Sequence, residues 1–227
     1  MPNIDDKVLA QFYEMINESK QTMFDSIAAE RTRHITVVME NVRKDHNASA
    51  VLRTCDCFGI QDLHAIEKGK DYTIQREIAR GAGNWVDLHS HTTGDHPEME
   101  CIQELKAKGY KIVATSPHAE RTIFDLDLAQ PMALVFGTER RGISETIQNE
   151  CDELIKIPMY GFTESFNVSV SVAIILNTLR NRLMNSDLEW KLSPEEQTKL
   201  KISWCSKYVN EGVRVEHEIR RRILEKE

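Results

Sequence analysis

The chain has 227 residues, enough for one large domain or for one domain with appendages. Hydrophobic residues make up 41% and charged residues 29%, a composition that supplies a core and excludes an intrinsically disordered chain. The formal net charge of -7 excludes a uniformly basic coat for nucleic acid, but it leaves room for a local basic stripe.

The five cysteines are scattered along the chain, and no apolar secretory leader precedes the first predicted helix. These features predict a reduced, cytoplasmic protein whose thiols are free and buried. No apolar run reaches the roughly 18 residues that a membrane span needs, so no membrane partner is expected. Cys55 and Cys57 lie near His64, yet their spacing matches no common zinc pattern, and the sequence predicts no metal.

Short β-branched and apolar runs alternate with segments of helical spacing along most of the chain. Strands are predicted at residues 34–39, 59–66, 110–115, 132–136 and 154–157. Helices are predicted at residues 7–30 (one or two), 47–58, 99–108 and 166–184, and again from Ser193 onward. Because strands alternate with helix-length segments, we expect an α/β fold with a parallel sheet flanked by helices.

The segment 166–184 has valines that alternate as in a strand, but its length without Gly or Pro favours a helix. After it, Ser193 followed by Pro194 is typical of a helix start. We therefore expect three parts: an N-terminal helical extension at 1–30, a central domain at 31–184 and a C-terminal helical extension at 185–227.

Polar residues crowd the connection between the first predicted strand and the next helix, where ligands bind in open parallel sheets. Arg53 follows Asn47 by about two helical turns, so both side chains can reach one bound group. A helix cap followed by a surface arginine is the alternative.

A second candidate loop follows the strand predicted at 132–136, and it holds Glu139 between Gly137 and Gly142. Glycines permit the close backbone approach that a ligand-cradling loop requires. The loop lacks the lysine and hydroxyl of a Walker loop and the dinucleotide fingerprint, so an ordinary strand-to-helix turn is the alternative.

A third candidate segment, residues 157–167, presents hydroxyl, amide and carboxylate groups just before the long apolar helix. Backbone amides at the helix start, with Ile157 and Phe166 beside them, suit a ligand that has a flat ring and a polar tail. The alternative is a capped helix with Phe166 in the core. The residues by themselves predict a ligand cleft and go no further.

The three segments, in this order, resemble the signature motifs of the SpoU family of RNA ribose 2'-O-methyltransferases, within the SPOUT superfamily. The matching stretches are Asn-Ala-Ser-Ala-Val-Leu-Arg-Thr at 47–54, Leu-Val-Phe-Gly-Thr-Glu-Arg-Arg-Gly-Ile-Ser at 134–144, and Ile-Pro-Met-Tyr-Gly-Phe-Thr-Glu-Ser-Phe-Asn-Val-Ser at 157–169. Three motifs in order are far more specific than any one of them.

The resemblance implies that the C-terminal part of the α/β domain threads into a deep trefoil knot. It also implies a homodimer that binds S-adenosylmethionine in the knot, with Arg53 facing the cofactor at the subunit interface. The helical extensions and the segment 82–89 look most like the TrmH type, which methylates guanosine 18 in the tRNA D-loop. The implied partner is therefore tRNA, not DNA. A ribosomal RNA ribose 2'-O-methyltransferase and a catalytically silent, RNA-binding knotted dimer are the alternatives.

Site residues are assigned by motif position. The resemblance implies a catalytic set of Arg53, Asn47, Glu139, Ser165 and Asn167, with the arginine as general base. Because a guanidinium is a poor base near neutral pH, we expect Arg53 to hold the RNA phosphate and the incipient ribose alkoxide, whether or not it also takes the proton. Expected cofactor contacts are Thr115, Gly137, Ile157, Ser165 and Phe166. Expected RNA contacts are Arg31, Arg33, Arg43, Lys44, Arg220, Arg221 and Arg222. Because acidic residues nearly balance the basic ones in the tail, a solvated helix face is the alternative there.

Overall fold

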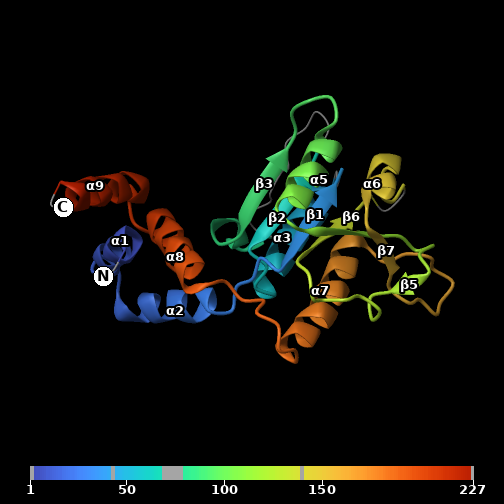
Figure 1. Cartoon of the computed structure of the whole chain (residues 1–227), viewed down its shortest axis with the longest axis horizontal. Helices are drawn as coiled ribbons and strands as arrows, with labels where there is room; N and C mark the ends of the chain where they lie inside the picture. Colours follow the sequence, from blue (N-terminus) through green and yellow to red (C-terminus); the bar gives the residue numbers. More distant parts are fainter. Residues whose placement is uncertain (1–2, 42–43, 68–78, 139–140, 226–227) are drawn as a thin grey trace. The chain divides into compact units, whose positions relative to one another are not determined.

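The computed structural model describes residues 3–41, 44–67, 79–138 and 141–225, which fall into two units (Figure 1). One unit joins the two ends of the chain, Met1–Arg31 and Lys191–Glu227, and the other is Thr32–Trp190. The sequence-based division treats the ends as two separate extensions, whereas the structure folds them together.

The larger unit is built on a parallel sheet with the strand order β3-β2-β1-β6-β4-β7-β5 in the described part of the chain. The strands are β1 (Ile35–Glu40), β2 (Asp62–Ile66), β3 (Asp87–His91), β4 (Lys111–Thr115), β5 (Arg121–Thr122), β6 (Met132–Phe136) and β7 (Glu153–Lys156). The predicted α/β fold with a parallel sheet is confirmed, and the trefoil knot stays a prediction.

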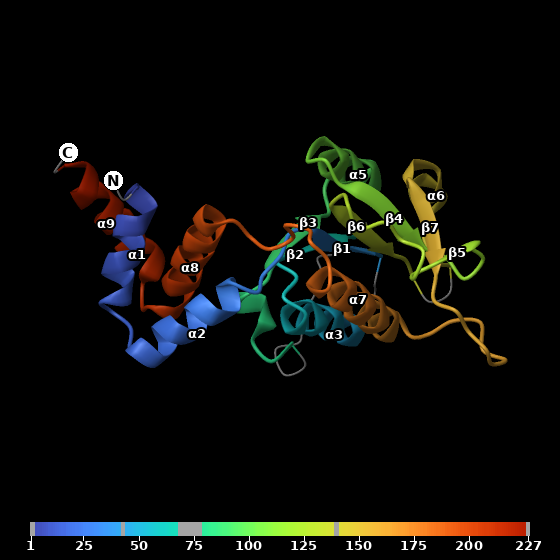
Figure 2. The same ribbon diagram turned by 60° about the horizontal axis from the view of Figure 1, so that its bottom comes forward.

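Helices cover both faces of this sheet. Successive strand residues point to opposite faces, so that Val37 and Val38 of β1 enter two different apolar cores. The first core is completed by α3 (Asp45–Cys57) and α7 (Val168–Met184), and the second by α5 (Pro97–Ala107) and α6 (Glu145–Glu150). Figure 2 shows α3 and α7 on one side of the sheet and α5 on the other.

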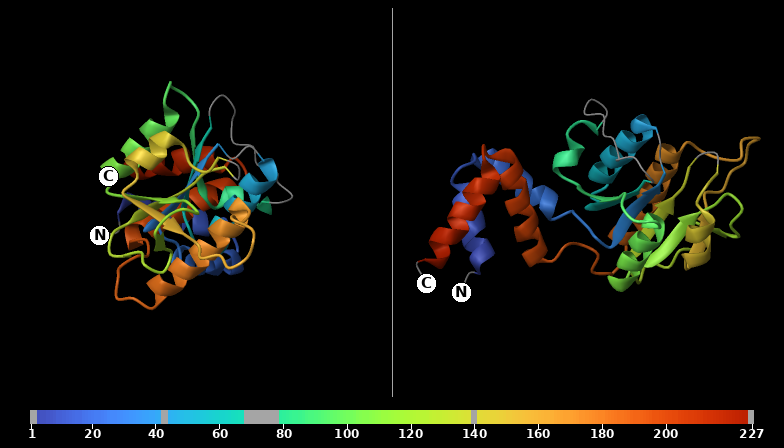
Figure 3. Two further views of the ribbon diagram at one scale, coloured as in Figure 1. Left: turned by 90° about the vertical axis from the view of Figure 1, so that its right-hand side faces the viewer. Right: turned by 90° about the horizontal axis from the view of Figure 1, so that it is seen from above.

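The smaller unit consists of helices in its described residues. They are α1 (Ile4–Tyr13), α2 (Glu18–Ala28), α8 (Pro194–Tyr208) and α9 (Gly212–Leu224). The first and last of them, blue and red in Figure 3, lie side by side. The rings of Phe24 and Trp204 pack with their centroids 5.5 Å apart, which ties the N-terminal helices to the C-terminal ones. The predicted helix start at Ser193 is confirmed, and Ser193 caps α8 through a capping box with Glu196.

Among the described residues, the short elements β3, β5 and α6 were not predicted from the sequence. The β3 sequence is Asp-Leu-His-Ser-His, which lacks the β-branched residues typical of a strand. The other two are too short to show a period, with two and six residues respectively. The strand β2 begins at Asp62 instead of residue 59, because Gly59 has a positive φ of 71° and ends the preceding helix.

All five cysteines lie among the described residues and are free, as predicted. The expectation that they are all buried is wrong for two of them, because Cys57 is exposed and Cys151 is partly exposed. In the described ranges, no helix has the length and apolar character to cross a bilayer.

Candidate functional site

A cavity of about 530 Å³ lies where β4, β6 and β7 end, in the larger unit. Its walls come from the carboxyl ends of these strands and from the segment that leads into α7, which is the usual ligand position in a parallel sheet. The residues expected to contact a cofactor all line it: Thr115, Gly137, Ile157, Ser165 and Phe166. The fold therefore brings the second and third motif segments to one hollow.

The loop after β6 makes one wall of the cavity out of backbone. Thr138 and Gly142 exchange backbone hydrogen bonds of 3.0 and 2.9 Å across the loop. A Cβ atom at position 137 would lie 2.1 Å from the backbone C and O atoms of Gly142, so only glycine fits there without a shift of the chain. Gly142 itself has a φ of +64°. Glu139, which belongs to the expected catalytic set, lies outside the described residues.

The first motif is joined to the third by a side-chain contact. The amide Nδ2 of Asn167 donates a hydrogen bond of 3.2 Å to Oδ1 of Asn47, which is buried on α3. The Oδ1 atom of Asn167 also accepts a hydrogen bond of 2.9 Å from the backbone N–H of Ser169 and thereby caps α7. Asn167 thus caps the start of α7 and links that start to α3.

Arg53 is exposed on α3 and is not among the residues that line the cavity. The structure therefore does not bring this arginine to the cavity of its own chain, although Asn47 on the same helix contacts the third motif. Ser165 both lines the cavity and is exposed, so its hydroxyl is accessible from solvent.

Sequence reasoning missed Glu40, which is buried at the end of β1. Its carboxylate accepts a hydrogen bond of 2.8 Å from the backbone N–H of Ser144, the N-cap residue of α6. A carboxylate near a helix N-terminus is stabilised by the exposed N–H groups there. Glu40 therefore anchors the exit of the glycine-bounded loop. The sequence feature that could have revealed Glu40 is an acidic residue at the end of an apolar, β-branched run.

The cations expected to contact RNA near the first motif have different surroundings. The expectation for Arg31 is corrected, because its side chain is buried with its guanidinium 5.5 Å from the ring centroid of Trp204. Arg33 forms ion pairs with Asp62 and Asp87 at 2.8 and 2.9 Å. Lys44 is exposed just before α3, and Arg43 lies outside the described residues.

The arginines of the tail lie on α9 and all have acidic partners. Arg220 contacts Asp5 at 2.8 Å and Glu216 at 2.9 Å. Arg221 and Arg222 both contact Glu218, at 3.0 and 2.7 Å, and the side chains of these two arginines remain 63% exposed. Hydrogen bonds from both lower the pKa of the Glu218 carboxyl, which keeps it ionised. The tail therefore presents exposed cations within an ion-pair network.

Residues 34–177 match the profile of the SpoU rRNA Methylase family. This chain, with its parallel sheet and three motif segments, belongs to the SpoU methylase family, and the resemblance inferred from its sequence is confirmed. Within the family it is similar to a tRNA (guanosine(18)-2'-O)-methyltransferase of Borreliella burgdorferi, with 33% identity over 210 residues, 91% of this chain and 94% of the relative.

Two solved structures are similar in fold. The A. aeolicus TrmH/SpoU tRNA modifying enzyme is 31% identical, with a TM-score of 0.76 over 85% of this chain and 98% of its own. An AdoMet-bound rRNA methyltransferase from Sinorhizobium meliloti is 23% identical, with a TM-score of 0.58 over 68% of this chain and 58% of its own. The similarity to the A. aeolicus enzyme covers more of this chain than the family profile does. The similarity to the Sinorhizobium meliloti enzyme shows a shared fold.

Proposed function

We propose that this chain transfers a methyl group from S-adenosylmethionine to the ribose 2'-hydroxyl of guanosine 18 in the tRNA D-loop. The observation that carries the proposal is the cavity lined by the second and third motif segments, with the first motif tied to them through Asn47 and Asn167. The choice of tRNA is supported by the named activity of the Borreliella relative, whose similarity spans 91% of this chain.

The cavity fits the proposed cofactor in size and chemistry. A volume of about 530 Å³ is in the usual range for sites that bind small molecules. Ile157 and Phe166 offer apolar surface for an adenine ring, and Thr115 and Ser165 offer hydroxyl groups. Because Gly137 has no side chain, a ligand can approach the loop backbone directly.

The cofactor supplies an activated methyl group, so the protein must supply position and charge. Methyl transfer requires the ribose oxygen to approach in line and its developing negative charge to be stabilised, while the hydroxyl proton passes to water and the demethylated thioether leaves. Guanidinium groups stay protonated near neutral pH, so we assign Arg53 to hold the nucleotide phosphate and the developing alkoxide. Asn167 and Asn47 position the third motif, and Ser165 and Glu139 orient the ribose or phosphate.

We propose that the active unit is a homodimer in which Arg53 of one subunit completes the cavity of its partner. This arrangement accounts for an arginine that is exposed and lies outside the cavity of its own chain. Near the cavity, Tyr160 and Phe162 are fully exposed, as expected of apolar side chains that an interface would cover.

Complementation tests the shared site. Arg53→Ala and Gly137→Ala should each be inactive, and a co-expressed mixture should regain activity because one site of the mixed dimer has both an intact cavity and an intact arginine. If the arginine acts within its own chain, the mixture stays inactive.

The activity itself is tested by incubating the purified chain with labelled S-adenosylmethionine and separate tRNA and ribosomal RNA pools, and then mapping the methylated ribose. We expect label in tRNA at guanosine 18. Label in ribosomal RNA alone would favour the ribosomal alternative. Binding of tRNA without incorporation would favour a silent RNA-binding dimer.

A further inference from the structure

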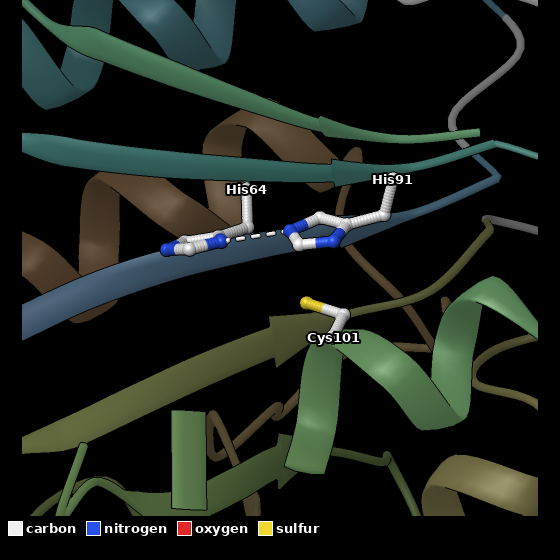
Figure 4. Close-up of side chains that lie close together, drawn as sticks. All are labelled: His64, His91 and Cys101. Atoms are coloured by element: carbon white, nitrogen blue, oxygen red, sulfur yellow. Dashed lines mark hydrogen bonds between the residues drawn. The ribbon is translucent and has the colours of Figure 1, made fainter. Parts of the chain in front are cut away.

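Two histidines and a cysteine converge at the β3 edge of the sheet, away from the residues that line the cavity (Figure 4). His64 lies on β2, His91 ends β3, and Cys101 lies on α5, which packs against both strands. Their candidate donor atoms all lie within 4.8 Å of one another. Figure 4 shows the Cys101 sulfur directed from α5 toward the two imidazole rings.

The two imidazole rings share a hydrogen bond of 3.0 Å between His64 Nδ1 and His91 Nε2. His64 and Cys101 are buried, whereas His91 is partly exposed to solvent. Burial lowers the pKa of His64 to about 3 and also lowers the pKa of His91, so both rings are neutral near pH 7. Neutral imidazole is the form that binds metals.

We propose that His64, His91 and Cys101 form a zinc site that clamps α5 onto the β2 and β3 edge of the sheet. Two imidazole nitrogens and one sulfur are a donor set that zinc prefers over magnesium or calcium. Tetrahedral zinc, with bonds of about 2.1 Å to nitrogen and 2.3 Å to sulfur, needs donors about 3.3–3.7 Å apart. In the structure the two imidazole nitrogens are 3.0 Å apart and all three donor atoms lie within 4.8 Å of one another, so small side-chain shifts would bring them to that spacing.

Binding changes protonation in a defined way. Burial raises the pKa of the Cys101 thiol to about 12, so the ion must displace the thiol proton and form a zinc–thiolate bond. Of His64 and His91, the ring that donates the shared hydrogen bond would change tautomer, so that its proton sits on the other ring nitrogen. Neither imidazole loses a proton. The bound ion and thiolate then carry one net positive charge.

Two acidic residues lie near this charge. Glu104 is one helical turn beyond Cys101 and interacts electrostatically with both histidines. Asp62 contacts His89 at 2.9 Å, and the His89 ring stacks on His64 with 4.5 Å between the centroids. This outer layer supplies negative charge and holds the His64 ring in place. With three protein ligands, water would take the fourth tetrahedral position, and zinc binding here does not depend on the proposed methyl transfer.

The experiment uses the purified full-length chain after chelator treatment and dialysis. Zinc is titrated against a chromophoric chelator, and cobalt is titrated as a spectroscopic probe. We expect one ion per chain and a cobalt–thiolate charge-transfer band in the near ultraviolet. Cys101→Ser and His91→Gln should each lower zinc affinity at least about tenfold. The matched controls Cys57→Ser and His118→Gln should bind zinc as the unaltered chain does.

The outcome for the unaltered chain is decisive even if a variant fails to fold. Absence of the cobalt–thiolate band, or a zinc stoichiometry well below one, would overturn the proposal. So would unchanged zinc affinity in folded Cys101→Ser and His91→Gln proteins, or loss of the band in Cys57→Ser.

Discussion

Asn167 Nδ2 donates a hydrogen bond of 3.2 Å to Asn47 Oδ1, and so joins two motif segments that lie 120 residues apart in the chain. Asn47 is buried, so its carbonyl oxygen would lose a protein partner without this contact. Because Asn167 also caps α7, one residue both starts that helix and adds a polar contact to its apolar packing against α3. The contact therefore couples the stability of the α3–α7 layer to the geometry of the proposed site.

A double-mutant cycle measures this coupling. Asn167→Ser keeps a side-chain oxygen that can cap α7 but is too short to reach Asn47, and Asn47→Ala removes the acceptor. We expect each single change to lower the free energy of unfolding, with a coupling energy of about 1 kcal/mol between them. Denaturant unfolding of the four proteins gives the value. Strictly additive losses would show that the contact contributes nothing.

Arg53→Ala should leave S-adenosylmethionine binding intact and lower methyl transfer at least about a hundredfold, because it removes charge from the developing alkoxide. Cofactor affinity is measured by calorimetry and turnover with labelled cofactor. Cys57→Ala is the matched control, since it truncates another exposed side chain of α3. Near-normal turnover of the Arg53 variant would refute the assigned role.

Gly137→Ala should abolish cofactor binding and lower the free energy of unfolding by about 1–3 kcal/mol. The added methyl group would lie 2.1 Å from the backbone of Gly142, which has no flexible side chain that could move aside. Gly161→Ala is the control, because a Cβ atom there meets nothing within 4 Å. The two variants are compared by thermal unfolding and by calorimetric titration, and equal behaviour would contradict this view of the loop.

With chelator present, the protein should lose stability as the pH falls below about 6.5. The pKa of His64 is about 3 in the folded protein and near 6.5 in the unfolded chain, so between these values only the unfolded chain gains the proton. The free energy of unfolding then falls with decreasing pH by at most about 1.4 kcal/mol per unit for this group.

Asp62 changes the stability with pH in the same direction, because its pKa is lower in the folded protein than in the unfolded chain. Its carboxylate stabilises the fold above the unfolded pKa, and this contribution is lost as the pH falls through the folded pKa. His64→Gln should therefore show a shallower decline than the unaltered chain in denaturant unfolding between pH 7 and pH 4. His118→Gln, a change at an exposed histidine, should decline as the unaltered chain does. Identical slopes in all three proteins would exclude His64 as the cause. The charged and titratable neighbours of His64 include His89, His91, Asp62, Glu104 and the thiol of Cys101.

Arg221→Ala combined with Arg222→Ala should weaken tRNA binding and make its dependence on salt shallower by about one unit of slope per lost phosphate contact. Both side chains are exposed, so the fold and cofactor binding should be unaffected. Filter binding over a range of salt concentrations measures the effect. Lys106→Ala removes another paired surface cation, since Lys106 contacts Glu150, and serves as control. Unchanged tRNA affinity in the arginine variant would favour a merely solvated helix.

The strands and helices whose residues show a clear apolar or β-branched pattern were predictable from the sequence. The run Met132–Phe136 was predicted with its observed bounds, and the helix near 166–184 forms as α7. Ser193 caps a helix because its side chain acts on N–H groups only a few residues away. The three motif segments were also identified from the sequence, since each is a local string of residues.

Only the tertiary structure decided which distant side chains meet. Arg31 looked like a surface cation but is buried against Trp204, because helices from both ends of the chain pack into one unit. His64 and Cys101 meet His91 through β3, a polar strand without a β-branched residue to reveal it. Local sequence patterns indicate whether a segment forms a helix or a strand. Which distant segments it packs against depends on the burial of whole helix and sheet faces, and no short stretch of sequence encodes that.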